Sequence, residues 1–133
     1  FSSIRLMLSS ILPEENKSIT IVTSLPPYAS LIPMEAINVC FAAAAFDLDV
    51  TLLFITDGVF QLCPEQDATS LGQKTLGKIL GAAPMYGIEK IYACEHSLRE
   101  RSLEKEKLIL SPTLVGTEEI NQLISGSNTL LSF

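Results

Sequence analysis

The sequence predicts an α/β protein, a three-layer α/β/α sandwich whose mostly parallel sheet has about five strands. Short β-branched or apolar runs alternate with segments of helical composition along the chain. Such alternation is typical of a parallel sheet, because each crossover between parallel strands needs a helix-length connection. The run Asp49–Thr56 (DVTLLFIT) is also apolar almost throughout, as expected for a strand that is covered on both faces.

Five segments are predicted to contribute strands, from their β-branched or continuous apolar composition. They are Ser18–Ser24, Asp49–Thr56, Ile88–Cys94, the pieces Leu108–Leu110 and Leu114–Val115 around Pro112, and Asn128–Phe133. The pieces around Pro112 are expected to form a fourth strand or the approach to one.

The longest predicted helix is Met34–Phe46 (MEAINVCFAAAAF). Its alanines favour helix, and because it is apolar nearly all round, we expect it to be buried on more than one side. A second helix is predicted over Gly72–Ala83 from the spacing of Leu76, Ile79 and Leu80.

Two shorter helical segments are predicted in the last third of the chain. The charged segment His96–Glu106 is expected to form a short helix or a turn. Thr117–Ser125 is expected to form a helix with Thr117 as its N-cap, acidic residues in its first turn and Gly126 as the C′ residue.

The composition favours a subunit of an assembly over a nucleic-acid-binding protein. Of the 133 residues, 47% are hydrophobic and only 18% are charged, and the mean hydropathy is +0.36. We therefore expect part of the apolar surface to be buried against other chains. The net charge of −6 argues against direct binding of nucleic acid, which needs clustered lysine and arginine.

We expect a single domain over residues 18–133 and an N-terminal extension outside the core over residues 1–17. No linker, repeat or low-complexity segment divides the chain. The apolar run Phe1–Leu12 is too short to span a membrane and lacks the basic start and the cleavage site of a signal peptide. We expect no membrane association.

The three cysteines, Cys40, Cys63 and Cys94, form no CxxC pattern, so neither a disulfide framework nor a metal site is expected. Free thiols in a compact chain fit a reducing cytoplasm. Cys40 lies within a predicted buried helix, and we interpret it as a small packed core residue.

The strongest candidate for chemistry is the end of the third predicted strand, IYACEHSLRER. Cys94 ends the apolar run, and the only histidine, His96, follows with Arg99 and Arg101. In parallel sheets functional groups collect at the carboxyl ends of strands, and neighbouring positive charge favours a reactive thiolate. The alternative is a strand-end cysteine that packs as a small apolar group.

Two further strand ends bear on function. Asp57 and Gly58 close the second predicted strand, where a turn is expected and where a functional loop would begin. The loop after the first strand, Thr23–Ser30, contains no glycine, so the glycine-rich phosphate-binding patterns are absent. This disfavours a flavodoxin-like nucleotide or flavin binder, which stays a third alternative.

Two motifs and the chain end resemble a known family. They are DGVFQL at Asp57–Leu62, CxxSLRER at Cys94–Arg101 and LLSF at Leu130–Phe133. In this order they resemble the TusC/DsrF subunit of the DsrE/DsrF/DsrH-like sulfur-relay proteins, from about residue 18 to the end. Ser102 departs from the glycine common in the family, and the first loop lacks a glycine often seen there.

The resemblance implies a three-layer α/β/α fold and a heterohexamer with TusB/DsrH-like and TusD/DsrE-like subunits. A TusBCD complex accepts persulfide sulfur from a TusA-like carrier and passes it to a TusE-like carrier, for 2-thiolation of the tRNA wobble uridine. A DsrEFH complex uses a similar relay in sulfur oxidation, which is the alternative. The resemblance implies no metal and no organic cofactor.

The resemblance also bears on Cys94. In the family the sulfur-carrying cysteine belongs to the TusD/DsrE subunit, at a strand end to which Cys94 corresponds in position. We therefore expect a non-carrier, structural and docking subunit of a sulfurtransferase complex; the alternative is that Cys94 itself carries persulfide. The residues expected to support the Cys94 site are Asp57, Gly58, His96, Ser97, Arg99 and Arg101.

Overall fold

A computed structural model describes residues 18–27, 30–64 and 71–133, except for the side chains of residues 71–75. Its strands are β1 (Ser18–Thr23), β2 (Asp49–Phe54), β3 (Lys90–Cys94), β4 (Thr113–Val115) and β5 (Thr129–Ser132). Its helices are α2 (Ile32–Ala45), α3 (Leu71–Gly81), α4 (Glu95–Glu100) and α5 (Thr117–Gly126), with 3-10 helices η1 (Thr56–Leu62), η2 (Ala83–Tyr86) and η3 (Lys105–Lys107).

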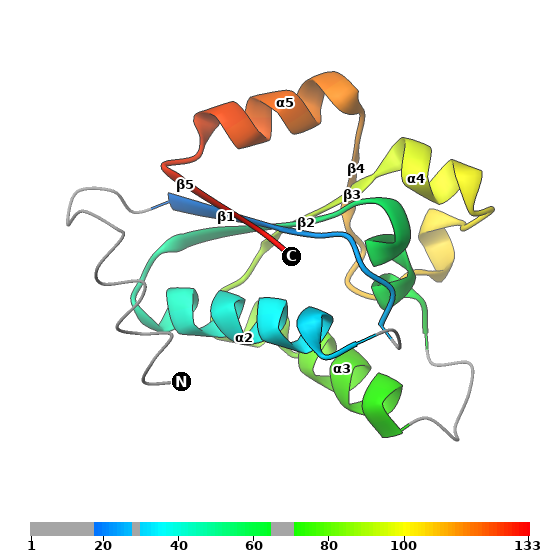
Figure 1. Cartoon of the computed structure of the whole chain (residues 1–133), viewed down its shortest axis with the longest axis horizontal. Coiled ribbons are helices and arrows are strands. Elements are labelled where there is room, and N and C mark those ends of the chain that lie inside the picture. The colour runs from blue at the N-terminus through cyan, green and yellow to red at the C-terminus, as the bar shows by residue number, and fades with distance from the viewer. Residues whose placement is uncertain (1–17, 28–29, 65–70) are drawn as a thin grey trace.

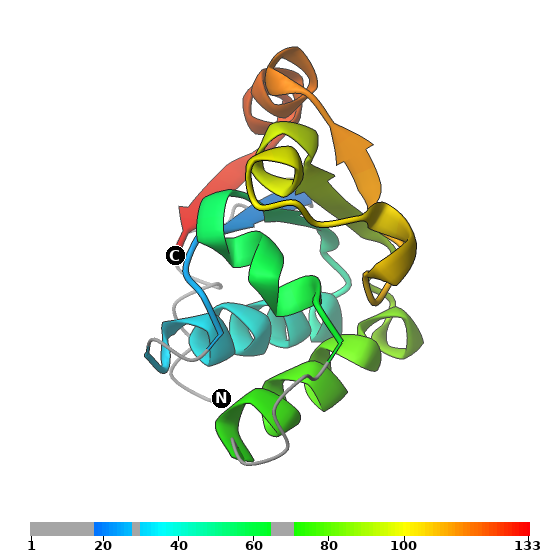
Figure 2. The same ribbon diagram turned by 90° about the vertical axis from the view of Figure 1, so that its right-hand side faces the viewer.

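The five strands form one sheet in the order β4-β3-β2-β1-β5, and every neighbouring pair is parallel. Helices α2 and α3 cover one face, and α4 and α5 lie on the other (Figure 1). The predicted α/β/α sandwich with a parallel, five-stranded sheet is therefore confirmed. Because all strands run the same way, their carboxyl ends meet at one edge of the sheet, which Figure 2 views from the front.

The main core lies between the sheet and the α2–α3 layer. Ile19 and Ile21 of β1 and Leu52 of β2 are fully buried there, and they pack in one cluster with Ile37 and Cys40 of α2. A smaller cluster on the opposite face joins Val22, Leu53 and Val115 to the inner side of α5. The smaller cluster agrees with the prediction that the strand Asp49–Thr56 is covered on both faces.

Helix α2 begins two residues earlier than predicted, at Ile32. Pro33 stands in its first turn, where the missing N–H costs nothing because that group has no partner within the helix. The predicted burial on more than one side is confirmed, since Ile37 and Val39, which are two residues apart and so point to opposite sides of the helix, are both buried.

Of the two predicted pieces around Pro112, Leu114–Val115 belongs to β4, and Leu108–Leu110 lies on the approach to this strand. Leu110 and Ser111 have φ angles of 70° and 43°, so the backbone there is left-handed and does not extend the sheet. The Ile109 N–H instead donates to the Leu62 carbonyl at 2.8 Å, which ties this segment to the end of η1.

The charged helix predicted over His96–Glu106 ends earlier in the structure. Helix α4 stops at Glu100, because Ser102 takes a left-handed φ of 54°, and the separate helix η3 follows.

The second strand also ends earlier than predicted, at Phe54, because Thr56 has a left-handed φ of 48°. The predicted turn at Asp57–Gly58 forms part of the 3-10 helix η1.

The caps of α5 also differ from the prediction. The N-cap is Gly116, and Thr117 is already helical; the Glu119 carboxylate accepts a hydrogen bond from the Gly116 N–H at 3.4 Å. Gly126 is the last helical residue, and Ser127 follows with an ordinary φ of −85°, so no left-handed C′ glycine is present. The predicted acidic first turn is confirmed.

The predicted extension, residues 1–17, lies outside the described residues. Within the residues that the structure describes, none of the helices is both long and apolar enough to cross a bilayer.

Leu52→Ala should lower the free energy of unfolding by about 2–5 kcal/mol, because it removes a fully buried side chain from the middle of the sheet. Leu130→Ala is the matched control, since Leu130 on the edge strand β5 is 43% exposed. Urea unfolding of the two variants measures the difference. Equal losses would contradict the assignment of the core.

Candidate functional site

Three connections meet at the carboxyl edge of the sheet: the segment after β1, helix η1 after β2, and helix α4 after β3. Figure 2 shows η1 in green and α4 in yellow in front of this edge. Each connection begins directly where its strand ends, so the register of β1, β2 and β3 fixes where their first residues lie. We call this region the carboxyl-edge site.

Thr56 joins the three connections. Its N–H donates to Ser97 Oγ at 2.9 Å, and its Oγ1 donates to the carbonyl of Ser24 at 3.0 Å. Ser97 is buried in α4, so these hydrogen bonds link η1 to both of its neighbours. They hold Thr56 in the left-handed conformation, which is unusual for a β-branched residue.

An ion pair adds a second link between η1 and α4. Arg101 Nε and Nη2 both lie 3.0 Å from Asp57 Oδ1, and Arg101 Nη1 donates to the Ser97 carbonyl at 3.1 Å. The Arg101 side chain is only 22% exposed. The predicted site residues Asp57, Ser97 and Arg101 are therefore brought together, although Asp57 and Arg101 lie 44 positions apart in the sequence.

Gly58 allows η1 to pack closely on the end of β1. A Cβ at this position would lie 2.2 Å from the carbonyl oxygen of Thr23 and 2.8 Å from its carbonyl carbon. The Gly58 N–H donates to the Ile55 carbonyl at 2.8 Å, which starts the turn. The glycine of the DGVFQL motif is thus required by a close approach between backbones.

Gln61 is a buried residue of the site that the sequence analysis did not single out. Its Nε2 donates to Thr23 Oγ1 at 2.9 Å and to the Leu25 carbonyl at 2.8 Å, so η1 holds the start of the loop after β1. The sequence does contain a signal for Gln61, which is a polar residue within the apolar run VFQL. A glutamine that is buried with such a run must find hydrogen-bond partners inside the protein.

The last residue also belongs to the carboxyl-edge site. The Phe133 N–H donates to the Val22 carbonyl at 2.8 Å, and the Phe133 oxygen accepts hydrogen bonds from both the N–H and the Oγ of Ser24, each at 3.0 Å. These bonds extend the pairing of β5 with β1 to the chain end. All three parts of the resemblance therefore contribute to one network.

Cys94 is half-buried at the end of β3, where it is also the N-cap residue of α4. Its side chain makes no capping hydrogen bond. His96 and Arg99 extend from the outer side of α4: His96 Nε2 lies 2.8 Å from Glu100, and Arg99 Nη2 lies 2.7 Å from Glu95. Both side chains are more than 70% exposed, so the structure does not bring them into the Thr56–Ser97–Arg101 network.

The other two thiols are less suited to nucleophilic chemistry. Burial strongly raises the pKa of the Cys40 thiol and also raises the pKa of Cys63, so both favour the protonated form. Cys94 is therefore the candidate thiol of the described chain. No group of three metal-ligating side chains is found within residues 18–27, 30–64 and 71–133.

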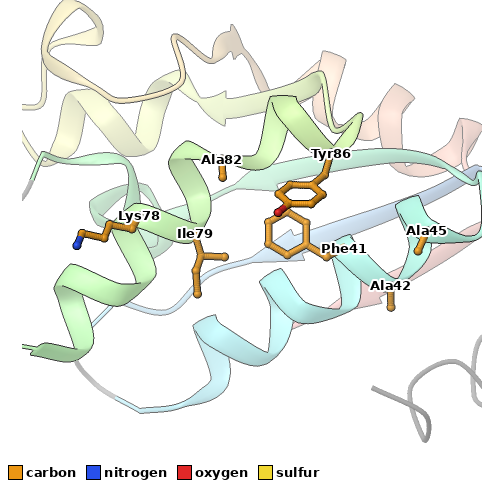
Figure 3. Close-up of a pocket in the computed structure, with 7 residues that line it drawn as sticks. All are labelled: Phe41, Ala42, Ala45, Lys78, Ile79, Ala82 and Tyr86. Atoms are coloured by element: carbon orange, nitrogen blue, oxygen red, sulfur yellow. The ribbon is translucent and has the colours of Figure 1, made fainter.

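A cavity of about 610 Å³ lies away from this site, in the layer formed by α2, α3 and η2 (Figure 3). The ring centroids of Phe41 and Tyr86 lie 5.1 Å apart on its wall, and the remaining lining residues include none of the predicted site residues. In Figure 3 the amino group of Lys78 points away from the two rings, so the wall beside them is apolar.

A model of the DsrE/DsrF-like family matches residues 17–133, which is most of the chain. The chain belongs to the DsrE/DsrF-like family. The match includes the carboxyl-edge site and every described strand and helix.

Curated relatives agree with this assignment. A "Protein TusC homolog" of Pseudomonas aeruginosa is 37% identical over 109 residues, covering 82% of this chain and 92% of that protein. A second "Protein TusC homolog", of Vibrio parahaemolyticus, is 30% identical over 107 residues, which cover 80% of this chain and 91% of that protein. The "Intracellular sulfur oxidation protein DsrF" of Allochromatium vinosum is 36% identical over 83 residues, which cover 62% of this chain and 61% of that protein.

A solved structure supports the fold. The crystal structure of ychN protein from E. coli superimposes with a TM-score of 0.70 and covers 89% of this chain and 99% of that chain. Its sequence identity is 16%, so it bears on the fold alone. The TusC and DsrF relatives make this chain a member of a sulfur-relay family, and the solved structure supports the fold.

Gly58→Ala should destabilise the protein by about 1–3 kcal/mol, because its Cβ would push η1 away from the Thr23 carbonyl. Gly77→Ala is the matched control: it lies in α3 with nothing within 4 Å of a new Cβ, and helix propensity predicts a gain of about 0.5–1 kcal/mol. Thermal unfolding compares the two, and a neutral Gly58→Ala would contradict the close packing of η1 on β1.

Proposed function

We propose that this chain is a structural and docking subunit, not the sulfur carrier, of a TusBCD-like complex that relays persulfide sulfur for 2-thiolation of the tRNA wobble uridine. The observation that carries the proposal is the 37% identity to the TusC homolog of Pseudomonas aeruginosa across 82% of this chain. The matched region includes both motifs that form the carboxyl-edge site.

Persulfide transfer requires a thiolate on the receiving cysteine. The thiolate attacks the outer sulfur of the donor persulfide, a new S–S bond forms, and the old S–S bond breaks to release the donor as a thiolate. We assign the receiving cysteine to a TusD/DsrE-like partner. This chain would position that partner and shield its reactive sulfur from oxidants.

The charges around Cys94 support the docking role over the carrier role. The basic side chains that follow it on α4, His96 and Arg99, already face Glu100 and Glu95 within the same helix. Arg101 faces Asp57. Because each of these basic side chains has an acidic partner, the side chains near Cys94 add little net positive potential to stabilise a thiolate or an anionic persulfide.

Several large apolar side chains are exposed, which supports a role as a subunit of a larger assembly. Leu31, Met85 and Tyr86 are 78%, 86% and 64% exposed, and large apolar side chains are common at subunit interfaces. We propose that TusB/DsrH-like and TusD/DsrE-like subunits cover part of this surface in a heterohexamer, and that TusA-like and TusE-like carriers meet the complex in the cytoplasm. The net charge of −6 supports the absence of direct contact with tRNA.

A second candidate is the corresponding subunit of a DsrEFH-like complex in sulfur oxidation. The 36% identity to DsrF of Allochromatium vinosum favours it. That match covers a smaller share of both chains than the match to the TusC homolog, so we place the tRNA branch first. A dissimilatory sulfite reductase encoded next to this chain would favour the second candidate.

Co-expression with the TusB-like and TusD-like chains of the same genome should yield a stable complex that retains this chain through affinity and size-exclusion chromatography. The tag is placed on the TusD-like chain, and an untagged preparation is the control. Failure of the full-length chains to associate under conditions in which the other two remain folded would contradict the proposal.

Cys94→Ser should leave tRNA 2-thiolation at the level of the unmodified complex, because the carrier cysteine lies on the partner. Thiolated tRNA is measured by its retardation on mercury-containing gels, in cells whose own copy of this gene is deleted. Replacing the strand-end cysteine of the TusD-like partner is the positive control and should abolish thiolation. Loss of thiolation in Cys94→Ser with the complex intact would favour the carrier alternative.

A further inference from the structure

The position of Cys94 depends on how α4 is held. Strand β3 ends at Cys94, and α4 begins at Glu95 with no loop between them. Helix α4 has six residues, which is too short for an isolated helix to be stable. The contacts that α4 makes with the rest of the protein must therefore fix both the helix and its N-cap residue, Cys94.

Three contacts hold α4 in place. Leu98 is buried and belongs to the larger apolar cluster, which also includes Val59 and Leu62 of η1. The Ser97 hydroxyl accepts the hydrogen bond from the Thr56 N–H. Leu98 and Ser97 lie in the middle of the helix. The third contact is at the end, where Arg101 bridges the Ser97 carbonyl and the Asp57 carboxylate of η1. Arg101 thereby holds the last turn of α4 against the neighbouring connection.

We propose that Arg101 is a positioning residue: by joining the end of α4 to Asp57, it fixes where Cys94 lies and how far its thiol is exposed at the carboxyl edge. The basic side chains within α4 make a different kind of contact. His96 and Arg99 pair with glutamates of the same helix, so these contacts move with α4 and do not fix its place.

The place of α4 also matters for docking, and this step rests on the proposed function. If a partner binds the carboxyl edge, a movable α4 would present a less defined surface to it. Loss of Arg101 should then weaken retention of this chain in the complex. The positioning role itself is tested on the full chain without partners, so its failure and the failure of the proposed function are distinguishable.

The test measures alkylation of each cysteine by iodoacetamide, in which the thiolate sulfur displaces iodide and forms an S–C bond. Mass spectrometry of the digested protein gives a rate for each thiol. The buried Cys40 serves as an internal control, because it reacts only when the protein unfolds. Cys63, which is partly buried at the end of η1, reports loosening elsewhere at the carboxyl edge.

Arg101→Ala should raise the alkylation rate of Cys94 by about threefold or more, because local opening of α4 exposes the thiol, while Cys40 stays unreactive. Lys90→Ala is the matched control. Its ion pair with Asp49, at 2.7 Å, joins β3 to β2 at the opposite edge of the sheet, so its loss should leave Cys94 at the wild-type rate. An unchanged rate in Arg101→Ala, or an equal rise in Lys90→Ala, overturns the proposal.

Asp57→Asn separates positioning from a direct effect of charge on the thiolate. If Arg101 acts by position, losing either partner frees α4, and both variants accelerate Cys94. If it acts by charge, Arg101→Ala slows the reaction and Asp57→Asn accelerates it. If the Cys94 rate falls in Arg101→Ala and rises in Asp57→Asn, the proposal is overturned. If Arg101→Ala unfolds the protein and so exposes Cys40, the test uses Asp57→Asn and Arg101→Lys in its place. The alkylation rate of Cys94 in Arg101→Lys should then lie between the rates in the wild type and in Asp57→Asn.

Discussion

The close approach of η1 to the end of β1 is the constraint on which the carboxyl edge depends. Only a hydrogen atom fits between the Gly58 α-carbon and the Thr23 carbonyl, and this contact seats η1 directly over the strand end. From that seat Thr56 reaches Ser97, and Asp57 reaches Arg101. A side chain at Gly58 would lift η1 and lengthen both contacts together, although neither involves the glycine itself.

The buried polar groups at the carboxyl edge keep this part of the structure ordered, because each of them needs its hydrogen-bond partner. Thr23, Gln61 and Ser97 are nearly inaccessible to solvent, and each has a hydrogen-bond partner. A buried polar group without a partner would cost far more than its bond contributes when made. Any movement that separates these partners is therefore opposed, and the surrounding contacts sustain the left-handed Thr56, which would otherwise relax.

The sequence predicts what local pattern determines and misses what distant residues determine. β1, β2 and β3 follow from β-branched or apolar runs, and the fold class follows from their alternation with helices. The Asp57–Arg101 pair could not be predicted from spacing, because it depends on parallel strands bringing two connections together. The composition could not decide which of the two apolar pieces around Pro112 forms the strand, because the left-handed backbone at Leu110 and the hydrogen bond from Ile109 to Leu62 depend on η1.

This division also explains why the motif around Cys94 predicts chemistry more readily than the structure supports it. Along the sequence, a cysteine followed by a histidine and two arginines indicates a positively charged thiol site. In space these basic side chains face Glu95, Glu100 and Asp57, so an acidic group lies beside each of them, and only the Arg101–Asp57 pair joins α4 to η1. A cysteine can thus lie at a strand end, followed by basic residues, while each of those residues is paired with a carboxylate of the same or the neighbouring element. The proposal of a docking role over a carrier role rests on this pairing.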